Sequence, residues 1–188
     1  VNGVPMSRFD GINGTKLYCV NTMNEWKAFF QLLRQQKLVA CDTETEGFHW
    51  YKGHRICGMS FGWGLTHFYI PVRHKSSLTG GEVDVQLSMD DIRADLQEFF
   101  GDKTVTTLWH SMKFDEKFYR ADGIEIKTLF HDTRILWQLY DENAPGALKT
   151  ISSGWKDELG NWHKGIVHKD ANSQEKLLDR WRTDESLA

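Results

Sequence analysis

The sequence lacks the marks of membrane and secreted proteins. No apolar run approaches the roughly 18 residues needed to span a bilayer, and no charged segment followed by an apolar one opens the chain. Its three cysteines are an odd number and form no C-x-x-C pair. This argues against a disulfide framework and against a zinc ribbon, and it fits a reducing compartment. We therefore expect a soluble, cytoplasmic protein.

A strong positive charge is also missing, because the formal net charge is −3. A protein that binds nucleic acid mainly by neutralising phosphates is expected to be strongly basic. Aromatic residues are abundant instead, with eight Trp and eleven Phe among 188 residues. If this chain binds nucleic acid, it does so through metal ions, stacking and local contacts. The length suits one domain with a full core.

The pattern of apolar residues predicts an α/β domain, a mixed sheet with helices packed on it. Residues 1–15 are glycine-rich and non-periodic, which predicts a loose lead-in. Residues 16–153 form the predicted domain, and residues 154–188 an arm followed by an incomplete helical part. Strands are expected at 16–20, from 38 through Asp42, and at 55–63, 67–71, 104–109 and 128–131. Helices are expected at 22–36, 88–101, 113–122 and 133–140, from 148, and at 172–182.

The most informative stretch is Leu38–Phe48, where an apolar run ends in Asp42 and Glu44. Side chains alternate along a strand, so residues two apart point the same way, and these carboxylates can share one hard divalent cation. The tripeptide D-x-E is common, however. In isolation, an Asp at a strand end followed by a solvated Glu explains it better than a metal site does.

Asp115 lies in the first turn of the helix expected after a buried strand. The helix dipole favours a carboxylate there, so we predict that Asp115 stays ionised and faces a cation directly or through water. A dipole-complementing Asp without a function is the alternative. Together with Asp42 and Glu44 at the same sheet edge, Asp115 predicts a cluster of three carboxylates.

Four stretches carry a resemblance to a known family. They are Asp42-Thr-Glu-Thr-Glu-Gly-Phe48, Tyr69-Ile-Pro-Val-Arg-His74, His110-Ser-Met-Lys-Phe-Asp115 and Asp132-Thr133. In this order and at this spacing they resemble the 3′-5′ exonuclease domain of family A DNA polymerases, within the DEDD superfamily. The likeness covers residues 38–151. One departure is Ser111, which stands where the second motif of the family has Asn.

The resemblance implies a ribonuclease H-like fold and a two-metal hydrolysis of the 3′-terminal phosphodiester of DNA, releasing nucleoside monophosphates. By position, Asp42 would bridge two Mg²⁺ or Mn²⁺ ions. Glu44 would hold the ion that activates the attacking water, and Asp115 would support the second ion, through water. Such a domain proofreads for a polymerase domain of the same parent chain.

The resemblance also implies a site for a single-stranded or frayed 3′ end. Thr45 and Phe48 would contact the terminal nucleotide, with Phe48 wedging against the last bases. Ser111, Lys113 and Phe114 of the second motif would contact the strand too. A solvated lysine in a first helical turn is an equally good account of Lys113.

The third motif of the family, Y-x-x-x-D, has no match, because none of the five tyrosines is followed by Asp four residues later. By family spacing it should fall at or just beyond Ala188. We therefore expect the chain as given to stop short of its fourth carboxylate. The histidine variant, H-x4-D, matches His110 to Asp115, but these residues already form the second motif.

Two other functions stay open. The missing third motif favours an inactive exonuclease-fold domain kept for DNA binding or for scaffolding, whereas the intact D-x-E and Asp115 favour activity. An RNase D-like exoribonuclease shares the carboxylates, but the 69–74 segment favours the polymerase family.

Weaker candidates complete the set. His49 and His54 flank a turn and are interpreted as surface residues. Asp132 is expected to bond a helix start or groups of the second motif. Three residues of the arm either touch a strand or pack on a neighbouring domain: Trp155, Trp162 and Lys164.

Overall fold

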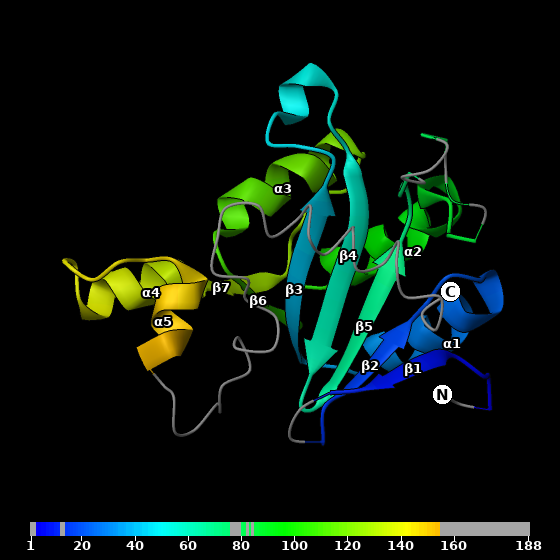
Figure 1. The fold of residues 1–188 in the computed structure, drawn as a ribbon, viewed down its shortest axis with the longest axis horizontal. Helices are drawn as coiled ribbons and strands as arrows, with labels where there is room; N and C mark the ends of the chain where they lie inside the picture. The colour runs from blue at the N-terminus through cyan, green and yellow to red at the C-terminus, as the bar shows by residue number, and fades with distance from the viewer. Residues whose placement is uncertain (1–2, 12–13, 76–79, 82, 84, 155–188) are drawn as a thin grey trace. The chain divides into compact units, whose positions relative to one another are not determined.

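The computed structural model describes residues 3–11, 14–75, 80–81, 83 and 85–154 (Figure 1). The chain divides into two compact units, Val1–Glu142 and Asn143–Ala188. The division falls at the start of Asn143-Ala-Pro-Gly146, where the periodic pattern of the sequence also breaks. The predicted arm, its two tryptophans and the predicted helix at 172–182 lie outside the described residues.

A mixed sheet of seven strands organises the first unit, within the part of the chain that is described. The strands are β1 (Ser7–Asp10), β2 (Lys16–Cys19), β3 (Leu38–Thr45), β4 (Ile56–Trp63), β5 (Thr66–Pro71), β6 (Thr106–Trp109) and β7 (Leu129–Asp132). Their order in the sheet is β1-β2-β5-β4-β3-β6-β7. Strands β3, β4 and β5 pair antiparallel, whereas β6 is parallel to both β3 and β7. The predicted α/β fold with a mixed sheet is confirmed.

The helices follow from capping signals and apolar stripes that the sequence already shows. They are α1 (Met23–Leu33), the short 3₁₀ helix η2 (Trp50–Lys52), α2 (Met89–Gly101), α3 (Met112–Ala121), α4 (Thr133–Tyr140) and, in the second unit, α5 (Leu148–Gly154). Thr22 and Glu25 form the predicted capping box of α1. The Ser88 side chain caps α2. None of the described helices combines the length and hydrophobicity needed to cross a membrane.

Aromatic side chains join α1 and α2 to one face of the sheet. The ring of Phe61 on β4 lies 5.6 Å from that of Phe29 on α1 and 6.1 Å from that of Phe99 on α2. Figure 1 shows both helices behind the strands. This packing buries one face of β3 and β4 and leaves the opposite face for polar side chains.

Several elements differ from the sequence prediction in their bounds, and one strand was not expected. Ser7–Asp10 forms the edge strand β1, where we expected a loose lead-in. All four of its residues are exposed, so the segment carries no apolar alternation that would reveal a strand. Helix α1 ends at Leu33 rather than at Gln36, because Arg34 already caps it. Helix α2 ends at Gly101, the last residue of the predicted range, and Asp102 is its C-cap.

Candidate active site

Strand β3 places Asp42 and Glu44 on the same face. Along this strand Val39, Cys41 and Thr43 are buried and the residues between them are exposed. The period of two that the sequence predicts is therefore present in the structure. Both carboxylates lie on the face opposite the aromatic core.

Partial burial raises the pKa of both carboxylates of β3. Partial burial raises the pKa of Asp42, while the Thr43 amide and His110 lower it. Burial also raises the pKa of Glu44, and the charge of Asp42 raises it further. His110 Nδ1 lies 2.9 Å from the hydroxyl of Thr133, which itself donates to a backbone carbonyl, so the ring is held in place. The site thus concentrates negative charge beside one histidine.

Asp115 reaches β3 at its unpaired edge. Strand β6 pairs with β3 only between Leu38 and Ala40, so the next residues of β3 present free backbone groups on that side. The Asp115 carboxylate accepts hydrogen bonds from the Thr43 amide at 3.1 Å and from the Thr43 hydroxyl at 2.5 Å. Because Thr43 lies between Asp42 and Glu44, helix α3 holds its carboxylate against the centre of the D-x-E motif.

Burial acts against the predicted ionisation of Asp115. Its side chain is 3% exposed. Burial raises the pKa of Asp115 to about 7, the bonds from Thr43 oppose this, and the charge of Asp42 adds to it. Desolvation outweighs the helix dipole because the carboxylate packs into the sheet edge rather than facing water.

Thr43 is a site residue that sequence reasoning missed. The motif D-T-E drew attention to its carboxylates, yet the threonine between them supplies both donors that orient Asp115. The sequence did carry a signal for this role. The residue between the two carboxylates is β-branched, bears a hydroxyl group and faces the buried side of the strand.

Asp132 joins the starts of two helices. Its carboxylate accepts from the amides of Ser111 at 3.0 Å and Met112 at 2.8 Å, where α3 begins. It also accepts from the amide of Arg134 at 3.0 Å, in the first turn of α4. The prediction that Asp132 bonds a helix start and groups of the second motif is confirmed. Asp132 thereby fixes the helix that carries Asp115.

Comparison with known proteins shows the family of the chain. A family model described as "3′-5′ exonuclease" matches residues 18–150. The chain belongs to the 3′-5′ exonuclease family. No curated protein matches the sequence.

Several solved structures share the fold of this exonuclease domain. The EXO domain of Aedes aegypti Nibbler matches with a TM-score of 0.57 and 15% identity, over 92% of this chain and 85% of that one. The catalytic core of RRP6 from Trypanosoma brucei matches with a TM-score of 0.55 and 15% identity, over 88% and 44%. The Trypanosoma brucei RNase D complex with RNA U12 matches with a TM-score of 0.51 and 17% identity, over 65% and 39%. The exonuclease domain thus spans less than half of the RRP6 core.

Carboxylate oxygens are the ligands that hard divalent cations such as Mg²⁺ or Mn²⁺ prefer, so the donor atoms of these three side chains suit such an ion. Asp42 raises the pKa of both Glu44 and Asp115, which is the repulsion that a bound cation would offset. Across the described residues, no group of three or more His, Cys, Asp or Glu side chains is placed to hold a metal ion. A joint metal site for these residues therefore remains a prediction.

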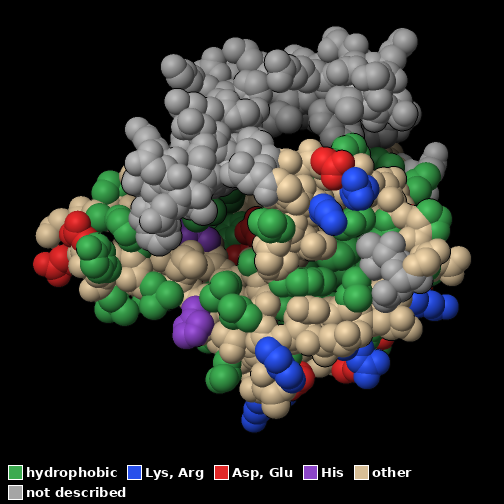
Figure 2. Space-filling view, turned by 90° about the horizontal axis from the view of Figure 1, so that it is seen from below, with side chains coloured by type: hydrophobic (Ala, Val, Ile, Leu, Met, Phe, Trp, Pro, Cys, Tyr) green, Lys and Arg blue, Asp and Glu red, His purple; other side chains and the backbone are tan. Residues whose placement is uncertain are grey.

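The residues predicted to contact nucleic acid surround this edge. Phe48 is 80% exposed, and its ring lies 6.3 Å from that of Phe114. The Thr45 hydroxyl donates to a backbone carbonyl of the same loop. Lys113 is exposed, and Ser111 is half-buried. Figure 2 shows Lys and Arg side chains scattered over the visible face rather than gathered in one patch. This agrees with a chain that lacks a strong positive charge.

The 69–74 segment adds a hydrogen-bonded pair on the carboxylate face. The strand register places Tyr69 on the same face as Asp42. Its hydroxyl lies 2.6 Å from His74 Nε2 and fills the space over Gly58, where a Cβ would come within 1.9 Å of it. Gly58 is the direct partner of Glu44 across β3 and β4. Burial raises the pKa of the Tyr69 hydroxyl, and Glu44 contributes to this rise.

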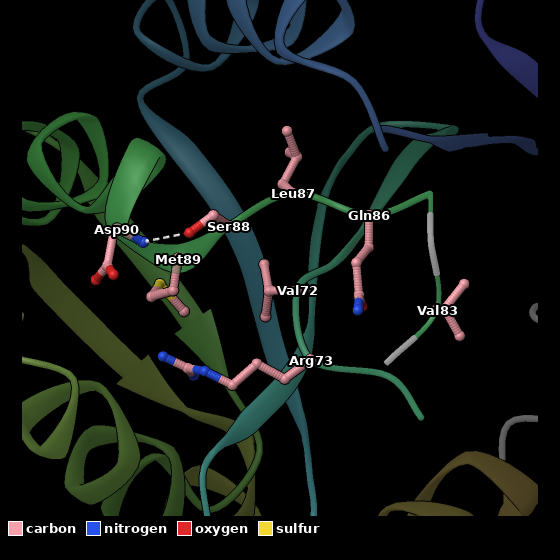
Figure 3. A pocket seen from close by; sticks show the side chains of 8 residues that line it. All are labelled: Val72, Arg73, Val83, Gln86, Leu87, Ser88, Met89 and Asp90. Carbon is pink, nitrogen blue, oxygen red and sulfur yellow. Dashed lines mark hydrogen bonds between the residues drawn. The ribbon is translucent and has the colours of Figure 1, made fainter. Parts of the chain in front are cut away.

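A pocket of about 460 Å³ lies between the end of β5 and the start of α2 (Figure 3). None of the three carboxylates lines it. Of its polar groups, Arg73 donates two hydrogen bonds to the buried carboxylate of Asp122, at 2.8 and 2.9 Å. The pocket is therefore separate from the candidate active site.

The conformation of Ser111 leads to a stability prediction. Among the described non-glycine residues, it alone has a positive φ, 70° with ψ 44°. The left-handed region costs ordinary L-residues about 1–2 kcal/mol, and Asn tolerates it best. We expect Ser111→Asn to raise the free energy of unfolding by about 0.5–1 kcal/mol in chemical denaturation.

The matched control for that change is Ser88→Asn. Ser88 has an extended backbone and caps α2, and Asn and Ser are equivalent N-caps. This control should leave stability unchanged. A gain at position 88 equal to that at 111 would show that the backbone strain is not the cause.

The buried carboxylate of Asp115 predicts a pH dependence of stability. Its pKa rises from 3.8 to about 7 on folding, so the folded chain binds the proton more tightly. The resulting stability is fully present below about pH 4 and is lost as the pH rises through 7. In chelator, we expect the free energy of unfolding to fall by on the order of 2–4 kcal/mol between pH 4 and 8. Asp115→Asn should remove this part of the slope; an unchanged slope would contradict the burial argument.

Proposed function

We propose that this domain removes nucleotides from the 3′ end of single-stranded or frayed DNA by divalent-metal-dependent hydrolysis. We further propose that it edits 3′ ends for an attached family A DNA polymerase. The observation that carries the proposal is the placement of Asp115 against Thr43, between Asp42 and Glu44. It brings Asp115, which is distant in the sequence, against the strand that carries Asp42 and Glu44.

Each residue has a part in this proposal. Asp42 and Glu44 offer oxygen ligands from one face of β3, and Asp115 offers a third from the first turn of α3. Thr43 and Asp132 position Asp115, because one orients its carboxylate and the other anchors its helix. Bound Mg²⁺ or Mn²⁺ would lower the pKa of the attacking water and stabilise the leaving 3′ oxygen.

DNA is the first candidate substrate, since the 69–74 segment is similar to that of the polymerase family. An exoribonuclease is the second candidate. It is supported by the fold shared with RNase D, a protein whose structure was solved in complex with RNA. The two candidates use the same carboxylates and differ in the sugar they accept.

The test uses 5′-labelled DNA and RNA strands of the same sequence, incubated with Mg²⁺, Mn²⁺ or chelator. We expect a ladder of products that shortens from the 3′ end, no products in chelator, and faster shortening of DNA. A strand blocked at its 3′ end should resist. Internal cleavage, or shortening in chelator, would contradict the proposal.

A further inference from the structure

The loop after β3 exposes a group of aromatic side chains. Phe48, Trp50 and Tyr51 are 80%, 41% and 64% exposed, and His49 is exposed beside them. In Figure 1 this loop is the cyan segment above the ends of β3 and β4. Large apolar side chains grouped on a surface mark an interaction site more often than singly scattered ones do.

Backbone bonds hold these aromatic side chains on an ordered loop. The Lys52 amide donates to the His49 carbonyl at 2.9 Å, and the Gly53 amide donates to the Trp50 carbonyl at 3.1 Å. The φ of 89° at Gly53 closes this turn. The His49 amide donates to Nδ1 of His54 at 3.1 Å. A partner would therefore meet rings that are already positioned, at a low cost in loop entropy.

The rings continue the surface that begins at the carboxylates. The ring of Tyr51 lies 5.4 Å from that of His49 and 5.9 Å from that of Trp50. Phe48, one residue earlier, contacts Phe114, the neighbour of Asp115 in α3. Aromatic side chains thus run from Phe114, in the first turn of α3, to the tip of the loop.

The charge of the loop selects the partner. Residues 47–55 contain no Asp or Glu, in a chain whose net charge is −3. Arg55 is paired with Asp122 at 3.9 Å, so Lys52 is the lysine or arginine of this stretch that lies beside the rings. Exposed aromatic rings beside cationic groups suit single-stranded nucleic acid, because each base offers a face for stacking and each phosphate a negative charge. An apolar protein partner would not require a lysine among the rings or a loop without Asp and Glu.

We propose that His49, Trp50 and Tyr51 form a stacking platform for bases upstream of the 3′-terminal nucleotide of a single strand. The platform is distinct from Phe48, which the proposed function places against the terminal bases. The platform rests on the proposed function only for the direction of the bound strand, whose 3′ end is taken to lie at the carboxylates. Stacking on the platform is independent of base sequence.

The test measures the affinity of a 5′-fluorescein-labelled single strand by anisotropy, in chelator so that no hydrolysis occurs. The loop variant is the double substitution Trp50→Ala with Tyr51→Ala. The matched control is Tyr140→Ala, which removes a ring 84% exposed on α4. We expect the loop variant to bind about tenfold more weakly or worse, and the control to bind as the wild type does. Because all three rings are exposed, thermal unfolding should be unchanged in both variants.

A strand with abasic sites only upstream of its 3′-terminal bases separates stacking on the platform from phosphate contacts and from contacts of Phe48. The wild-type chain should lose about as much affinity for this strand as the loop variant loses for the intact one. The loop variant should lose little more. Equal affinities of wild type and loop variant, undiminished binding of the abasic strand, or no strand binding by the wild type would each overturn the platform. Loop-dependent binding without any 3′ shortening would keep the platform and remove the catalytic proposal.

Discussion

Replacing Asp42 by Asn should reduce the metal-dependent shortening of DNA by about 10²–10³-fold or more. This is the scale on which the loss of one preorganised electrostatic group acts. Asp42 is the carboxylate whose charge raises the pKa of both Glu44 and Asp115, so it is central to the negative charge of the site. The amide keeps the size of the side chain. Initial rates of product formation in Mg²⁺ measure the effect.

Thermal stability distinguishes this loss from misfolding. Since Asp42→Asn removes a repelling charge, the melting temperature should stay the same or rise. The matched control is Asp91→Asn, a carboxylate exposed in the first turn of α2, which should keep the full rate. Full activity of Asp42→Asn would remove Asp42 from the reaction.

Asp132→Ala should destabilise the fold by about 2–4 kcal/mol. The substitution removes the acceptor that caps α3 and α4 together, and each lost N-cap costs about 0.5–2 kcal/mol. Because the Met112 amide at the start of α3 is buried, the loss of its partner puts the sum in the upper part of that range. Chemical denaturation measures the effect. Because α3 carries Asp115, exonuclease activity should fall as well.

The control for Asp132→Ala is Ser88→Ala, which removes the cap of a single helix. Ser88 accepts one hydrogen bond, from the Asp90 amide, so this change should cost about 1 kcal/mol. If Asp132→Ala costs no more than Ser88→Ala, the carboxylate does not hold two helices at once.

Elements set by local signals were predictable from the sequence. The capping box at Thr22 and Glu25 predicted where α1 begins, and the alternation along β3 predicted that Asp42 and Glu44 share a face. The exonuclease family followed from the spacing of several such motifs and was confirmed. Signals of this kind depend on neighbours in the chain, which the sequence displays.

Features set by distant contacts were not predictable. The pKa of Asp115 depends on its burial against Thr43, a residue far away in the sequence. The edge strand β1 carries no apolar alternation, so its pairing with β2 left no signal. Turn residues revealed the bend after Phe48. That the bend presents its rings outward became visible only in three dimensions.

Binding of Mn²⁺, followed by electron paramagnetic resonance, tests most directly whether Asp42, Glu44 and Asp115 act as one site. We predict that the wild-type chain binds Mn²⁺ and that each single amide variant, Asp42→Asn, Glu44→Gln and Asp115→Asn, weakens the affinity by about tenfold or more. Asp91→Asn should leave the affinity unchanged. Equal affinity in the wild type and all three variants would contradict the account.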